Sequence, residues 1–422
     1  MHLTYRLYKW IYDTFMTILI IGWITFPFGS ASGSRIRTLS TGLVENGHGV
    51  HVLTTHRLLH RNDDLQTDGT LAYKGITYEG TNVPEVPGNK LSLPERIRNH
   101  IMAIIKSWFR FAEIARNKKC SSVYIYGRSF VSYGPICLLA RLYGIKIIFD
   151  ICEWFPANRY KGRYLNPSFI NDFLGRQLPR FCRGKVVAIT SYIKTKYEAY
   201  GVPCILIPSV YDFRNQSDSA PITNHESRSD EFNVVYAGTC KSSDGVAILF
   251  DAIRIAAKEG CPVRLKMVGS DGKSRTSLKF GKICQQDEIL KNHITFCGRL
   301  SEADYAKTLS TADCLALPRP DTQTNRAAFP TRLPEFLATG RPVLTSDTPD
   351  IPLYVEAGKH AEIVPAKGGA PALAQGILTL WKNPDYASQI GEQGQLRCKE
   401  VFDSHAHLTQ LSCLICPSTQ TN

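Results

Sequence analysis

The order of apolar and polar positions predicts short buried strands that alternate with amphipathic helices along most of the chain. Residues 16–22 form an apolar run, a loop rich in glycine and serine leads into a helix that ends near Leu43, and residues 50–54 form a second apolar run. Continuous apolar runs of this length are typical of strands covered on both faces of a parallel sheet. The pattern therefore predicts the start of a doubly wound α/β domain.

The same alternation continues to about residue 208 and begins again near residue 232. Further strands are expected at residues 76–78, 122–126, 146–150 and 186–190, and then at 233–237, 264–268, 293–296, 314–317 and 343–345. The stretch 215–230 between the two series is rich in Ser, Asn and Asp, as linkers are. We predict an N-terminal Rossmann-like domain over 16–208, a linker over 209–231, a C-terminal domain over 232–385, and a helix over 386–411 that packs back towards the N-terminal domain.

A segment at 94–119 has the periodicity of an amphipathic helix. Its apolar residues recur at helical spacing, and cations flank them: Arg96, Arg98, Lys106, Arg110, Arg116, Lys118 and Lys119. Two interpretations stay open: the apolar stripe packs on the sheet, or the helix lies on an anionic membrane.

Positive charge is concentrated in the first half of the chain. Residues 1–210 contain 27 Lys and Arg against 13 Asp and Glu, whereas the remaining residues contain 23 against 24. The first half thus carries +14 and the second −1. Such asymmetry indicates an anionic partner for the first half, either membrane phospholipid, a lipid phosphate or nucleic acid, although solubility is an alternative reason.

Several protein classes are disfavoured by the sequence. The apolar run 15–28 is too short and interrupted for a membrane span and lacks a signal-peptide cleavage pattern, so Met16 is the true start or residues 1–15 form an interfacial tail. The 13 cysteines lack the grouping of a zinc site or a disulfide framework, which indicates a reduced, cytosolic chain. The first glycine loop does not have dinucleotide spacing, and no acid follows the second strand, so a nicotinamide cofactor is not expected.

Candidate chemistry gathers at the predicted carboxyl ends of the strands and in the segment 329–346. Asp150 and Glu153 follow one strand of the first half, where a parallel sheet has its ligand crevice. In 329–346, Thr331 is an expected N-cap, and Arg332 and Glu335 lie three residues apart on one side of a short helix that Gly340 ends. This segment is either an anion site for phosphate or an ordinary capped helix with surface charges.

The strand 314–317, the Pro318–Arg319–Pro320 turn and the run from Phe329 to Val343 resemble the family 4 retaining glycosyltransferases of the GT-B fold. The branch of bacterial surface-polysaccharide assembly is the most similar. The resemblance extends from residue 16 to about 411 and is strongest in the second half. It implies an α/β, GT-B architecture of two Rossmann-like doubly wound domains that face each other across a cleft.

The resemblance also assigns roles to residues of the nucleotide-sugar donor site. It implies that Glu335 holds the ribose, that Arg332 and the helix start at Thr331 and Leu333 meet the diphosphate, and that Gly298 and Arg299 lie against the nucleobase. Gly238 is expected on the phosphate side. Ser32 and Gly33 are expected in the glycine loop of the other domain.

The chain departs from the family pattern at four places. Ala327 stands where a first glutamate is expected, and Thr239 and Asp244 stand where Arg and Lys are expected. Lys241 and Arg319 are the substitute cations. Asp150 and Glu153 occupy roughly the place of the histidine that many members carry on the acceptor side.

The resemblance implies an enzyme, a retaining hexosyl- or glycosyltransferase of surface polysaccharide (capsule or exopolysaccharide) biosynthesis. It would move a sugar from a nucleotide-diphosphate sugar to a lipid-linked or other saccharide acceptor. No Asp-x-Asp occurs, so neither metal nor other cofactor is expected, and Lys241 and Arg332 would stabilise the leaving phosphate. We expect a cytoplasmic protein, peripheral on the anionic inner membrane surface, without a nucleic-acid partner. The alternatives are a nucleotide-sugar epimerase that uses Asp150 and Glu153, and a donor-binding partner subunit that has lost catalysis.

Overall fold

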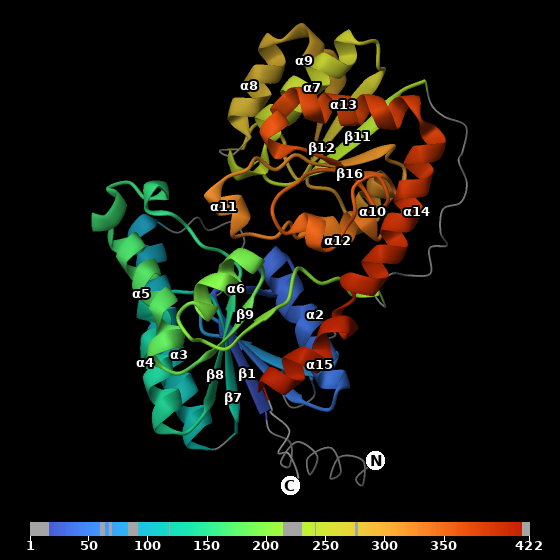
Figure 1. Cartoon of the computed structure of the whole chain (residues 1–422). Helices are drawn as coiled ribbons and strands as arrows, with labels where there is room; N and C mark the ends of the chain where they lie inside the picture. Colours follow the sequence, from blue (N-terminus) through green and yellow to red (C-terminus); the bar gives the residue numbers. More distant parts are fainter. Residues whose placement is uncertain are drawn as a thin grey trace. The chain divides into compact units, whose positions relative to one another are not determined.

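A computed structural model describes residues 17–59, 64–66, 70–82, 92–117, 119–213, 230–240, 242–274 and 277–415. The chain divides into two compact units, of which unit 1 contains residues 1–210 and 404–422 and unit 2 contains residues 211–403. Figure 1 follows the chain through both. The expectations for residues 1–15 and Met16, and most of the expected linker, lie outside the described residues.

Unit 1 is built on an eight-stranded sheet with the order β10-β9-β8-β7-β1-β3-β6-β5. The strands are β1 (Thr17–Gly22), β3 (Gly49–Thr54), β5 (Leu71–Tyr73), β6 (Ile76–Gly80), β7 (Ser122–Tyr126), β8 (Lys146–Ile151), β9 (Lys185–Ala188) and β10 (Cys204–Leu206). All neighbours are parallel except β5 and β6. The chain adds strands first on one side of β1 and then on the other, which makes the sheet doubly wound. A small parallel ribbon pairs β2 (Thr25–Pro27) with β4 (Arg57–Leu59).

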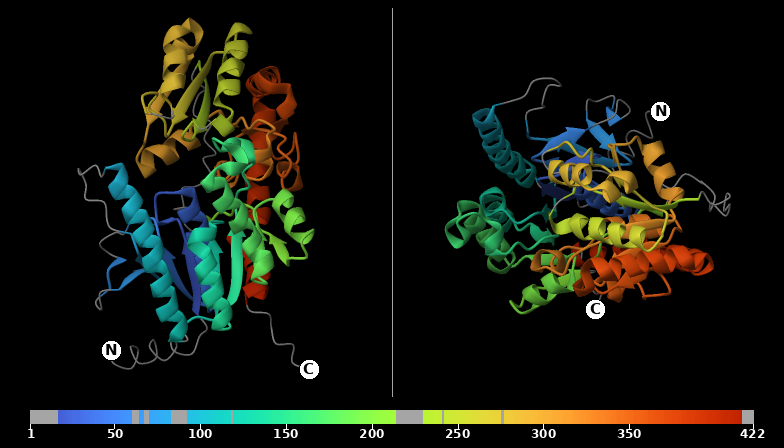
Figure 2. Two further views of the ribbon diagram at one scale, coloured as in Figure 1. Left: turned by 90° about the vertical axis from the view of Figure 1, so that its left-hand side faces the viewer. Right: turned by 90° about the horizontal axis from the view of Figure 1, so that it is seen from above.

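Helices cover both faces of this sheet. They are α2 (Ala31–Glu45), α3 (Leu93–Arg116), α4 (Phe130–Leu142), α5 (Pro167–Phe181), α6 (Ser191–Glu198) and α15 (Ser404–Ile415). Figure 1 shows α2 and α15 on one side of the strands and α3, α4 and α5 on the other, and the left view of Figure 2 turns the second group towards the viewer. α15 packs against α2 and places Leu411, Leu414 and Ile415 in the unit's core.

The chain forms two helices where the sequence predicted one over 386–411. The first, α14 (Pro384–Val401), belongs to unit 2, and α15 belongs to unit 1. The break follows from Phe402, which is fully buried in unit 2 against Phe329 and Tyr354. Its carbonyl oxygen accepts a hydrogen bond from the backbone N–H of Tyr211 at 2.8 Å.

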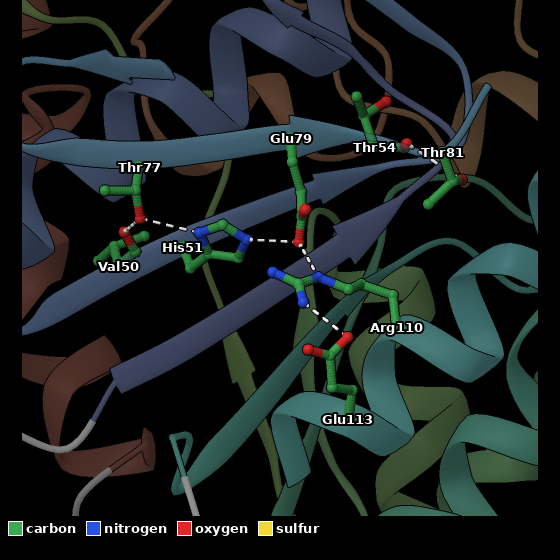
Figure 3. A network of polar contacts seen from close by, with 8 residues as sticks. All are labelled: Val50, His51, Thr54, Thr77, Glu79, Thr81, Arg110 and Glu113. Atoms are coloured by element: carbon green, nitrogen blue, oxygen red, sulfur yellow. Dashed lines mark hydrogen bonds and ion pairs between the residues drawn. The ribbon is translucent and has the colours of Figure 1, made fainter. Parts of the chain in front are cut away.

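Helix α3 packs on the sheet only through its second half. Ile104, Phe111 and Ile114 are buried, whereas Ile97 and Ile101, expected on the same stripe, are about half exposed. A polar network fixes the buried part (Figure 3). His51 of β3 contacts Thr77 and Glu79 of β6 at 2.8 and 3.0 Å, and Arg110 of α3 donates to Glu79 at 2.7 Å.

Unit 2 has a six-stranded parallel sheet with the order β13-β12-β11-β14-β15-β16. Its strands are β11 (Phe232–Ala237), β12 (Val263–Val268), β13 (Ile294–Gly298), β14 (Cys314–Leu317), β15 (Val343–Ser346) and β16 (Glu362–Val364). Its helices are α7 (Val246–Lys258), α8 (Leu278–Gln286), α9 (Glu288–His293), α10 (Glu302–Ser310), α11 (Gln323–Arg326), α12 (Arg332–Leu337), α13 (Gly369–Lys382) and α14. α7 and α13 pack together over the sheet and enclose its largest core cluster.

The predicted fold class, with two Rossmann-like α/β domains, is confirmed within each unit. Within the described ranges, no helix has both the length and the apolar content that crossing a bilayer requires. The cysteines of these ranges form no disulfide, and most of them are buried.

Candidate functional site

Three glycine turns meet at the carboxyl edge of the sheet in unit 2. The N–H of Gly238, after β11, donates to Val268 O at 2.9 Å, and the N–H of Gly269, after β12, donates to Gly298 O at 2.7 Å. A Cβ added at Gly269 would lie 3.1 Å from Gly238 O, and the φ angle of Gly269 is +82°. The backbones at the ends of three strands therefore touch, which leaves main chain accessible to a ligand. Gly238 and Gly298 were predicted from the resemblance, and Gly269 was missed.

The loops after β11 and β14 approach each other just as closely. A Cβ on Gly245, whose φ angle is +74°, would lie 1.4 Å from Pro318 O. Asp244, which stands where a lysine was expected, accepts a hydrogen bond from the Tyr236 hydroxyl at 3.0 Å. This carboxylate also acts electrostatically on Arg319.

Arg319, predicted as a substitute cation, is half-buried and has a donor to spare. Its Nη2 donates to Asn325 Oδ1 at 2.8 Å, but its buried Nε has no hydrogen-bond partner among the described residues. Burial lowers the pKa of Arg319 to about 10, although Asp244 acts in the opposite direction. Since buried polar groups are nearly always hydrogen-bonded, an unmatched donor here suits an incoming anion.

Asn325 and Ala327 show what replaces the expected first glutamate. The Asn325 amide is buried and donates to Ser243 O at 3.0 Å and to Pro320 O at 2.8 Å, so it braces the loop. Ala327 is fully buried. The chain therefore presents no carboxylate at that position.

Arg332 and Glu335 form a pair on one side of α12, which confirms the predicted placement. Arg332 Nη1 donates to Glu335 Oε2 at 2.8 Å and also contacts the Tyr305 hydroxyl, and its guanidinium lies 5.5 Å from the centroid of the Tyr305 ring. Burial opposes the charge of Arg332, but Glu335 outweighs it and raises the pKa of Arg332. The two side chains are 39% and 30% exposed, so a ligand can reach both.

The remaining predicted residues of unit 2 differ in what they offer. Thr331 is the N-cap residue of α12, as predicted, although its side chain makes no capping hydrogen bond. Leu333 is fully buried, so only its backbone is available. Arg299 is exposed. Lys241 lies outside the described residues.

Asp150, at the carboxyl edge of unit 1, is fully buried and bound to Arg35. Arg35 donates to both carboxylate oxygens, at 2.9 and 3.1 Å, and the Tyr124 hydroxyl donates at 2.8 Å. Arg35 also donates to the carbonyl oxygens of Ile207 and Pro208. Burial opposes this charge, but Asp150 outweighs it and raises the pKa of Arg35. The carboxylate thus has a structural partner that sequence reasoning missed, and its catalytic role stays a prediction.

Glu153 is the accessible carboxylate of this edge. Its side chain is 49% exposed and accepts from Arg128 Nη1 at 3.2 Å. The guanidinium groups of Arg128 and Arg159 lie 4.3 and 3.7 Å from the centroid of the Phe155 ring. Glu153 is therefore the one of the two predicted acids that solvent reaches.

Ser32 and Gly33 lie in the first turn of α2. The Ser30 hydroxyl caps this helix by accepting from Gly33 N at 3.0 Å, and it contacts the Ser32 hydroxyl at 2.9 Å. A Cβ at Gly33 would lie 2.1 Å from Thr25 O. Packing of α2 against β2 thus accounts for this glycine.

Two further observations bear on ligands. In the described part of the chain, no three His, Cys, Asp or Glu side chains are grouped as a metal site would need. A hollow of about 880 Å³ in unit 2 is lined by Tyr354, Lys359, His360 and Arg397 among others, and none of the predicted donor-site residues lines it.

Comparison with known proteins places this geometry in context. Residues 231–383 match the family model described as "Glycosyl transferases group 1". No curated protein matches the sequence at a significant level.

Solved structures resemble both units. A sucrose-phosphate synthase from Thermosynechococcus elongatus has a TM-score of 0.67 at 16% identity and covers 94% of this chain and 98% of its own. A glycosyltransferase from Rickettsia africae has a TM-score of 0.68 at 15% identity, with coverage of 97% and 100%. Anabaena HepE in complex with UDP-glucose has a TM-score of 0.66 at 15% identity, with coverage of 94% and 98%. The fold is that of GT-B glycosyltransferases, and the match to the group 1 family model lies within unit 2.

Proposed function

We propose that this chain transfers a sugar from a nucleotide-diphosphate sugar to a lipid-linked saccharide, in the biosynthesis of a surface polysaccharide. The observation that carries the proposal is the Arg332–Glu335 pair of α12, because it lies inside the segment that matches the group 1 family model. An arginine and a carboxylate that are both accessible suit a diphosphate and a ribose. That Anabaena HepE was solved with UDP and with UDP-glucose supports a donor of this class.

In the proposed mechanism, charge develops on the diphosphate as the sugar–phosphate bond breaks. Arg332 and the spare Nε–H of Arg319 would stabilise it, and cations fixed in place before the reaction lower such a barrier. The glycine turns at 238, 269 and 298 would let the phosphates approach the main chain. Retention of configuration and independence of a metal are parts of the proposal that rest on the resemblance and on the missing Asp-x-Asp.

The buried pairing of Asp150 bears on the epimerase alternative. That reaction needs acid–base groups, and Arg35 occupies both oxygens of Asp150, which leaves Glu153 as the accessible acid. This favours transfer over epimerisation. The second candidate is a donor-binding subunit without catalysis, and the buried alanine at position 327 favours it.

Titration calorimetry with a nucleotide-diphosphate sugar tests the donor site. We expect Arg332→Ala and Glu335→Ala each to weaken binding about 10-fold or more, as the loss of a hydrogen bond to a charged group does. The matched controls are Arg264→Ala and Glu231→Ala. That pair is also 2.8 Å apart and similarly exposed, but it lies at the amino ends of β11 and β12. Equal affinity for all four variants would refute the site.

A thermal-shift panel of UDP-, GDP-, ADP- and CMP-sugars identifies the donor, and the CMP-sugars test the need for a diphosphate. Incubation with the stabilising donor and a lipid-linked acceptor then separates the candidates. A glycosylated lipid supports transfer, an epimerised nucleotide sugar supports the epimerase, and binding without turnover supports the subunit that has lost catalysis.

A further inference from the structure

Exposed large apolar side chains are concentrated in unit 1. In the described part of unit 2 the exposed members are Leu278, Leu353 and Leu396. In unit 1 a single continuous stretch, the 3₁₀-helix η3 (Arg163–Leu165) and the following α5, exposes six: Tyr164, Leu165, Ile170, Phe173, Leu174 and Phe181. Leu165 is 86% exposed, more than any other large apolar side chain of the described residues.

These six side chains belong to one continuous surface. Ile170, Phe173, Leu174 and Phe181 recur at helical spacing and define the outer stripe of α5, whose inner side carries Asp172, Gly175 and Leu178. The ring of Phe169 joins the stripe to η3, with centroids 5.5 Å from Tyr164 and 6.0 Å from Phe173. Helix α4 packs against the other side of α5 (Figure 1).

Cations greatly outnumber acids along this part of the chain. Residues 157–183 contain six Lys and Arg but a single acid, Asp172. Asp172 is buried and engaged by Arg128 and Arg176, so it does not reach the surface. The exposed cations are Arg159, Lys161, Arg163, Arg180 and Arg183, and none of them forms an ion pair with a residue of the described ranges.

We propose that this η3–α5 face, defined by the six apolar side chains and five cations, docks on an anionic phospholipid bilayer. Apolar side chains that enter the headgroup boundary, with cations beside the phosphates, are the chemistry of interfacial binding. Charge argues against a second copy as the occupant, because a two-fold contact would bring the same five cations of both chains together. The proposal deepens the proposed function, since a lipid-linked acceptor lies in such a bilayer.

Co-sedimentation of the full chain with vesicles tests the docking surface. Vesicles of phosphatidylcholine mixed with phosphatidylglycerol are compared with pure phosphatidylcholine. We expect binding to the mixed vesicles only, and less of it as salt rises, because salt screens the cations. Binding that ignores phosphatidylglycerol would overturn the proposal.

Two double variants of the exposed face locate the contact. We expect Leu165→Ser with Phe173→Ser to abolish binding. We expect Arg180→Gln with Arg183→Gln to weaken it about fivefold for each cation removed. The matched control is Leu353→Ser with Leu396→Ser in unit 2, where the side chains are 56% and 54% exposed. Phe109→Ser, in α3 and 73% exposed, tests the other cationic helix.

The outcomes separate this inference from the proposed function. Wild-type binding by both double variants, or its loss only in Phe109→Ser, would overturn the assignment of the face. So would light scattering that finds a dimer for the wild type and monomers for both variants, since the occupant would then be a second copy. Melting temperatures with the nucleotide sugar check donor binding independently. A chain that binds vesicles through this face but no donor would refute the proposed function and leave the docking surface standing.

Discussion

Each sheet has an arginine at its carboxyl edge, and the two arginines differ in how far their hydrogen-bond donors are matched by acceptors of the protein. In unit 1, Arg35 meets both oxygens of Asp150 and two backbone carbonyl groups, so its charge is matched inside the protein. In unit 2, Arg319 has one amide partner, and its buried Nε has none among the described residues. The donors of Arg35 are thus satisfied within the fold, whereas Arg319 keeps an N–H without a partner among the described residues.

The largest effect is expected on stability, when the carboxylate that pairs with Arg35 is removed. Asp150→Ala leaves Arg35 buried without its carboxylate, and removing one partner of a buried ion pair costs about 3–5 kcal/mol. We expect the free energy of unfolding of unit 1 to fall by that amount in urea titrations followed by circular dichroism. The control is Glu113→Ala, which removes an exposed pair with Arg110 and should cost less than about 1 kcal/mol. Equal losses of stability in the two variants would contradict the view that Arg35 and Asp150 form a structural pair.

A smaller effect is expected on ligand affinity, when Arg319 with its unmatched Nε is replaced. Arg319→Met should lower the affinity for a nucleoside diphosphate about 10- to 100-fold, because a hydrogen bond to a charged group contributes about 1.5–3 kcal/mol. Stability should change little, since the variant also removes an incompletely paired buried charge. Calorimetry and urea titration measure the two quantities. Arg326→Met is the control, because Arg326 of α11 is 50% exposed and pairs with Asp321 at 2.7 Å. Lower stability with unchanged affinity would give Arg319 a role like that of Arg35.

The smallest effect concerns Glu79 of β6, whose carboxylate accepts hydrogen bonds from His51 and Arg110 (Figure 3). Burial pushes its pKa up, but the hydrogen bonds from His51 and Arg110 outweigh burial and lower the pKa from 4.5. The carboxylate therefore stabilises the fold above pH 4.5, and this contribution is lost as the pH falls through the lower value of the folded state. Glu79→Gln should flatten the loss of stability below that pH relative to the wild type. Parallel urea titrations of the variant and the wild type at several acidic pH values measure this difference.

The strands were predictable because burial on both faces leaves a local signal. The apolar runs at 122–126 and 314–317 coincide with β7 and β14, and the other expected strands differ from the observed ones at their ends by one or two residues. The sequence did not reveal β2, β4, β5, β10 and β16, which have three residues each, and β5 and β16 are mostly half-buried. Short, partly covered strands lack the apolar run on which the prediction depends.

The candidate site was predictable where its partners are close in sequence. Arg332 and Glu335 share a helical turn, so spacing alone placed them together. Arg35 and Asp150 are separated by 115 positions, and Tyr305 and Arg332 by 27, so no local pattern joins them. The resemblance identified Arg319 as a cation of the site. Its unmatched Nε depends on packing that sequence does not express.

Helix α15 has a consequence for how the chain folds during synthesis. Its side chains Leu411, Leu414 and Ile415 lie in one cluster with Ile18 and Ile20 of the first strand. All residues of unit 2 leave the ribosome before α15 does. Unit 2 can therefore reach its final structure while the core of unit 1 still lacks the side chains of α15. The first unit to be translated is therefore the last to be completed. A stalled or clipped chain that ends before residue 404 would expose the core of unit 1 to chaperones and proteases.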